Sequence, residues 1–73
     1  MQTQRLNDNC YNTIHQLTKT LEFLSHADTY VQDANNVGDD KAKQVWNTIK
    51  EDRQKHADML KELITYEVQN NKF

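Results

Sequence analysis

The chain contains no proline and a single glycine, Gly38, within 73 residues. Proline and glycine interrupt helices more than any other residues, so their near absence favours long and unbroken helices. Turn-forming residues gather at only one place, the stretch Asn35-Asn36-Val37-Gly38-Asp39. We therefore predict one all-α domain in which this stretch separates two helices.

Cysteine is as scarce as glycine, because Cys10 is the only one, and this excludes a disulfide within the chain. A domain of this size that lacks disulfides usually needs a metal or a partner to be stable. Long uncharged apolar runs are also missing, so we expect no membrane span. The N-terminal residues lack the apolar core of a signal peptide, and we expect a cytoplasmic protein.

Basic residues are not in excess either, because 9 Lys and Arg stand against 11 Asp and Glu. Binding to nucleic-acid phosphates needs a basic face, so we expect no nucleic-acid partner. The sequence has no glycine-rich phosphate loop and no readable Ser-His-Asp arrangement. Cys10 lies in step with apolar residues, which is typical of a small buried residue rather than a nucleophile. These absences favour a non-catalytic protein without a cofactor.

What the chain does contain is a strong helical periodicity. Apolar residues recur in alternating steps of three and four, the pattern of helices that pack against other helices. We place the helices at about 6–35 and 40–69, with the loop at about 36–39. The row in the first helix contains Cys10, Ile14, Leu17, Leu21, Leu24, Asp28 and Val31. The row in the second helix contains Ala42, Val45, Ile49, Asp52, His56, Met59, Leu63 and Tyr66.

A second row runs beside each of these, so each apolar face is too wide for a single neighbour. The short loop makes the two helices antiparallel neighbours. We therefore predict that hairpins close over one another as a four-helix bundle, in a homodimer or a higher oligomer. The predicted interface residues are Leu17, Leu21, Leu24, Trp46, Ile49, Arg53, His56, Leu60 and Leu63. A coiled-coil adaptor that pairs with a different protein is the alternative, and a clean homo-oligomer on purification would argue against it.

Polar residues interrupt the apolar rows at Asp28, Asp52 and His56, with Arg53 beside them. One interpretation is a buried ionic layer that sets the register between helices. The other is a metal site, because a carboxylate and a histidine at i, i+4 can chelate one ion of iron or zinc. Asp52 and His56 have this spacing, and Asp28 of a second subunit could complete the site.

A further candidate for a surface ion lies on the face opposite the leucine row. Glu22 and His26 are one turn apart there, with His15 on the same face. Exposed pairs with this spacing are common on helices, and their ordinary role is to face solvent.

The run from Lys50 to Leu63, KEDRQKHADMLKEL, resembles the second helix of rubrerythrin and ferritin-like proteins. In that family an acidic stretch is followed by Glu-x-x-His, a small residue and leucine-rich turns; His56 and Ala57 match this pattern. The resemblance extends from about Cys10 and implies a ferritin-like hairpin fold.

The chain departs from the family at both glutamate ligands, where it has Thr20 and Arg53. Arginine places a permanent cation where the family would hold its ion. We therefore predict a non-catalytic structural or protein-interaction module on the ferritin-like frame. The alternative is a metal-binding or redox-stress protein that uses His56 with Asp52, Asp28 or Glu22.

Overall fold

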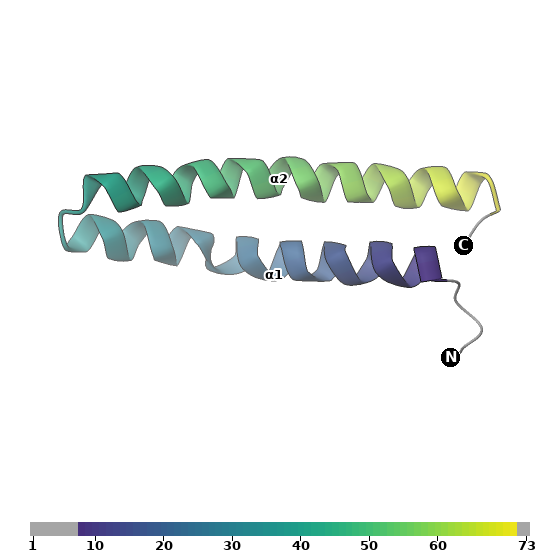
Figure 1. Ribbon diagram of the computed structural model, residues 1–73, viewed down its shortest axis with the longest axis horizontal. Helices are drawn as coiled ribbons and strands as arrows, with labels where there is room; N and C mark the ends of the chain where they lie inside the picture. Colours follow the sequence, from purple (N-terminus) through teal and green to yellow (C-terminus); the bar gives the residue numbers. More distant parts are fainter. Residues whose placement is uncertain (1–7, 72–73) are drawn as a thin grey trace.

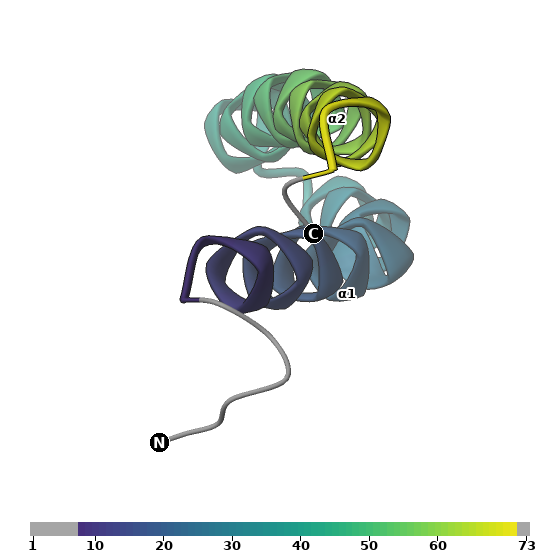
Figure 2. The same cartoon turned by 90° about the vertical axis from the view of Figure 1, so that its right-hand side faces the viewer.

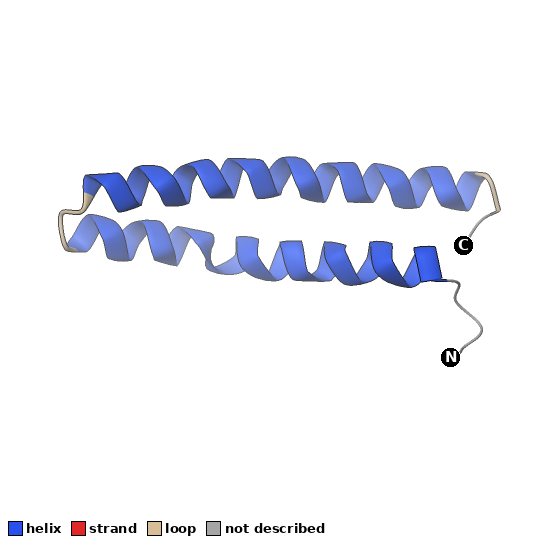
Figure 3. Ribbon diagram, viewed as in Figure 1, coloured by secondary structure: helices blue, strands red, loops and turns tan. Residues whose placement is uncertain are grey.

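The computed structural model describes residues 8–71. Two helices, α1 (Asp8–Asn36) and α2 (Asp40–Gln69), lie side by side in opposite directions (Figure 1). Seen from the end, they form a single pair with no further element against either face of the described part (Figure 2). The described residues contain no strand (Figure 3), which confirms the all-α helical hairpin. The expected start of the first helix at residue 6 lies outside the described residues.

A tight turn joins the two helices, and its backbone hydrogen bonds explain why it is so short. Gly38 adopts the left-handed conformation with φ of 71°. Its N–H donates to the carbonyl of Asn35 at 3.1 Å, and the N–H of Asp39 donates to the carbonyl of Ala34 at 3.0 Å. This pair of bonds is a Schellman cap, which satisfies the last carbonyls of α1. The carboxylate of Asp39 then accepts the N–H of Ala42 at 2.9 Å and caps α2, so one residue serves both helices.

Small side chains line the contact between α1 and α2. On α2 the central residue is Ala57, which has no exposed surface. Residues of this size let two helix backbones approach closely. The hydroxyls of both buried threonines donate to the carbonyl one turn earlier at 2.8 Å, so they are satisfied within their own helix. The buried residues of α1 are Cys10, Thr13, Thr20, Ala27 and Ala34.

The larger apolar residues flank this contact, which corrects the position of the predicted packing rows. In α1, Ile14 and Leu21 are each 43% exposed, so the predicted row meets α2 only through its other members. In α2, the flanking residues Leu60 and Ile64 are half-buried against α1, whereas Met59 is 63% exposed. The physical reason is distance, because alanine and threonine permit an approach that leucine would block. The predicted row of α2, here called the outer row, is therefore left largely uncovered.

An aromatic cluster stabilises the half of the hairpin nearest the turn. The ring centroids of Tyr30 and Trp46 are 5.0 Å apart, and Phe23 lies 5.9 Å from Tyr30 and 6.4 Å from Trp46. The guanidinium carbon of Arg53 lies 5.2 Å from the centroid of Phe23, as in a cation–π contact. Trp46, predicted as a subunit contact, thus packs against its own chain.

Polar contacts between the helices fix their register over the whole length. Near the open end, the amide nitrogen of Asn9 donates to the buried carboxylate of Glu67 at 3.5 Å. In the half nearest the turn, Lys50 Nζ donates to Asp28 Oδ1 at 2.5 Å. Both pairs join residues that lie at nearly the same distance along the chain from the turn, as expected for antiparallel helices.

The hairpin is too elongated to enclose a core of its own. Its Cα radius of gyration is 16.3 Å, compared with about 11 Å for a compact domain of this length. Its accessible surface is 5490 Å², roughly 800 Å² more than a compact monomer of 8.7 kDa would have. Neither helix, within the described residues, has the length and apolar character that a membrane span requires.

Candidate functional site

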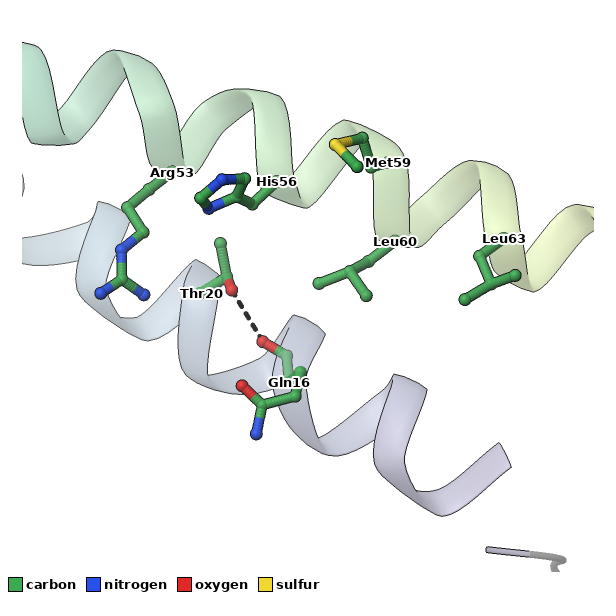
Figure 4. A pocket seen from close by; sticks show the side chains of 7 residues that line it. All are labelled: Gln16, Thr20, Arg53, His56, Met59, Leu60 and Leu63. Atoms are coloured by element: carbon green, nitrogen blue, oxygen red, sulfur yellow. Dashed lines mark hydrogen bonds between the residues drawn. The ribbon is translucent and has the colours of Figure 1, made fainter. Parts of the chain in front are cut away.

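A groove of about 500 Å³ opens on one flank of the contact between the two helices (Figure 4). Most of its wall comes from α2, and α1 contributes two polar residues to the opposite side. The residues that line it are Gln16, Thr20, Arg53, His56, Met59, Leu60 and Leu63. Four of the predicted interface residues are among them, and all four come from α2.

The periodicity of α2 explains why these side chains meet. Arg53, His56, Leu60 and Leu63 follow one another in steps of three, four and three, so they project from the same side of the helix. Across the groove the hydroxyl of Thr20 points back into its own helix and its methyl group points towards α2 (Figure 4). The groove lies on the flank of this close contact, between Gln16 and Thr20 of α1 and the larger side chains of α2.

The groove combines an apolar surface with positive charge at one end. Leu60 is half-buried, whereas Met59 and Leu63 remain exposed to solvent. Arg53 and His56 stand beside them, and within residues 8–71 neither forms an ion pair with a carboxylate. Such a surface can bury apolar groups and accept a negative charge from outside the hairpin.

The remaining predicted interface residues divide between the two flanks of the hairpin. Leu17 and Leu24 are half-buried beside the contact with α2. Leu21 and Gln16 are five positions apart and therefore about 140° apart around α1, so Leu21 faces away from the groove. Ile49 is half-buried and continues the apolar surface of α2 from the groove towards the turn. The sequence predicted one interface, and the structure distributes its residues over two surfaces.

The residues of the first predicted metal site do not come together within one chain. Asp28 is held by Lys50, and its side chain is 84% exposed. Asp52 and His56 are exposed one turn apart on α2. Among the described residues, no three His, Cys, Asp or Glu side chains are placed to hold one metal ion. A site that combines Asp52 and His56 with a second chain stays a prediction.

The residues of the second predicted ion site have neighbours of other kinds. Glu22 lies 3.9 Å from the ammonium of Lys19, and both side chains are largely exposed. His26 stacks near Tyr30 with ring centroids 6.3 Å apart. The third residue of this face, His15, stacks on the ring one turn earlier in α1. A surface ion at Glu22 and His26 also stays a prediction.

Thr20 and Gln16 are groove residues that sequence reasoning did not identify as such. The sequence pattern marks Thr20 only as the residue at the position of a glutamate ligand. The available signal was the recurrence of Thr13, Thr20, Ala27 and Ala34 every seven residues, which marks a small-residue stripe along α1. The burial of Glu67 was also missed, and nothing in the local pattern of charges indicates it.

No protein family model, curated protein or solved structure matches the chain. The resemblance to ferritin-like proteins therefore stays a prediction that depends on the residues around His56.

Proposed function

We propose that the protein is a non-catalytic, self-associating helical module, in which hairpins close over one another as a four-helix bundle of ferritin-like build. The observation that carries the proposal is the groove and its apolar margin, where Met59 is 63% and Leu63 is 38% exposed. The apolar side chains on this surface, Met59, Leu60 and Leu63, are of types that usually form a core. A role in structural assembly or protein interaction follows from such a surface.

The size of the hairpin's surface supports a partner of comparable size. The hairpin exposes roughly 800 Å² more than a compact monomer, which is of the same order as the area that one partner contributes to a standard protein interface. A second hairpin is long enough to cover the groove and the outer row together, because both run along α2. Burial of a leucine or methionine side chain contributes about 1.5–3 kcal/mol, and in a symmetric dimer each contribution counts twice.

Sedimentation equilibrium over a range of concentrations tests the proposal, with Met59→Lys as the disrupting variant. Lysine has nearly the helix propensity of methionine, so the helix is retained while a charge enters the interface. We expect association to weaken at least about tenfold. The matched control is Val37→Lys, because Val37 is 78% exposed and lies in the turn, away from the groove.

The expected result is a dimer or larger oligomer for the natural chain and for the control, and a shift towards monomer for Met59→Lys. A cooperatively folded monomer of 8.7 kDa at every concentration would overturn the proposal. Association that Met59→Lys leaves unchanged would remove the groove from the interface.

The metal-binding alternative has one observation in its favour. Asp52 and His56 are exposed, correctly spaced for chelation, and free of hydrogen bonds or ion pairs within the described part of the chain. A thermal shift on addition of zinc or ferrous ion, abolished by His56→Ala, is the expected result if this site is used. Unchanged melting with either ion would end the alternative.

A further inference from the structure

We propose that the second copy docks its α2 against α2 in antiparallel orientation, about a two-fold axis level with Gln54, so that Asp52 of each chain pairs with His56 of the other. This inference rests on the proposed self-association and specifies its geometry. Its basis is the chemistry of the outer row of α2, which is complementary to itself in this one arrangement.

The spacing of the residues in the outer row is symmetrical about position 54. Its members follow in steps of three, four, three, four, three, four and three, and they are Ala42, Val45, Ile49, Asp52, His56, Met59, Leu63 and Tyr66. Two antiparallel copies with the axis at this level align the row member by member. The resulting contacts are Ala42 with Tyr66, Val45 with Leu63, Ile49 with Met59, and Asp52 with His56. A two-fold interface needs this reciprocity, because each contact must occur twice.

Shifting one copy by a heptad destroys the match. In one direction Asp52 meets Leu63 of the partner copy, and in the other direction it meets Ile49. Either shift buries a carboxylate against an aliphatic side chain without a partner, which is unfavourable. A parallel arrangement in register fails as well, because it places Asp52 against Asp52. A single polar pair in an apolar seam is an established way of selecting one register among several.

The structure leaves this row available for such a contact. Asp52 and His56 are both exposed, and within residues 8–71 neither has a hydrogen bond or ion pair that association would have to break. The guanidinium of Arg53, held near the ring of Phe23, adds positive charge beside His56. The corresponding row of α1 is a poorer candidate, because its only acidic residue, Asp28, is bound to Lys50.

Charge exchange within the pair provides the first test. Asp52→Lys places a lysine opposite His56, and His56→Glu places a glutamate opposite Asp52. Each single variant therefore loses both Asp52–His56 pairs of the dimer. We expect each to weaken dimerisation at least about tenfold, because Asp52→Lys removes the carboxylate that accepts from His56, and His56→Glu sets two carboxylates against each other across the interface. The double variant restores opposite charges in both contacts and is expected to recover association to within about threefold of the natural chain. Lysine and glutamate both favour helices, so the hairpin is retained. A chelator in every buffer excludes a metal bridge.

Site-directed cross-linking tests the register directly. In a Cys10→Ala background, a mixture of Ile49→Cys and Met59→Cys chains, oxidised with diamide, is expected to give a disulfide-linked dimer. Either variant alone is expected to give little. Efficient linkage of Ile49→Cys to itself would overturn the inference.

The two proposals fail in different ways. If the natural chain is a dimer by sedimentation but the double variant does not recover and the mixed cysteines do not link, the register is wrong and self-association stands. If the natural chain is monomeric at all concentrations, both are wrong.

Discussion

Replacement of Ala57 by leucine tests the close contact on which the hairpin depends. Ala57 has no exposed surface and lies between Arg53 and Leu60 on α2, at the level of Thr20 on α1. Leucine adds three carbon atoms where no space is left, and overpacking of this kind costs about 1–3 kcal/mol. Leucine and alanine have similar helix propensities, so the lost stability reports packing rather than helix formation. For a chain of this length the cost corresponds to a fall in Tm of about 7–20 °C.

Thermal unfolding followed by far-ultraviolet circular dichroism measures this effect. All variants are compared at one protein concentration, because self-association makes Tm depend on concentration. Glu62→Leu is the matched control, since Glu62 is exposed on the same helix. We expect its Tm to stay close to that of the natural chain. If Ala57→Leu also melts within about 2 °C of the natural chain, the helices are not in close contact at this level and the derived register is wrong.

Two further substitutions test the aromatic cluster and the turn. Trp46→Ala removes ring contacts with Tyr30 and Phe23 and is expected to cost about 2 kcal/mol, less than a fully buried tryptophan, in urea unfolding followed by circular dichroism. Weaker association with unchanged hairpin stability would instead place Trp46 between subunits. Gly38→Ala is expected to cost about 1–2 kcal/mol through backbone strain alone, because φ is 71° and nothing lies within 4 Å of the added carbon. Gly38→Asn should lose less in the same assay, and equal losses would contradict a left-handed turn residue.

Local interactions determined the elements of this protein, and the sequence alone was enough to predict them. Gly38 and the carboxylate of Asp39 affect only the few residues next to them, through backbone conformation and helix capping. The absence of proline likewise acts locally, because it leaves the backbone of each helix unbroken. The predicted location of the break between the helices needed no knowledge of what either helix touches. Part of the groove was predictable for the same reason, because the spacing of His56 and Leu63 places them on one side of a helix.

Only the tertiary structure decided which face of each helix is covered. Both helices carry apolar rows on adjacent faces. The sequence pattern predicts that the more hydrophobic rows, those with leucine and methionine, are the packing faces. In the folded hairpin the packing face is instead the one that lets the two backbones approach closely, and it contains Thr20, Ala27 and Ala57. The larger side chains were therefore left at the flanks, where Met59 borders a groove whose opposite wall comes from a residue 39 positions away, Thr20. The distance between the two backbones depends on the side chains of both helices, so the sequence pattern of one helix does not predict which face is covered.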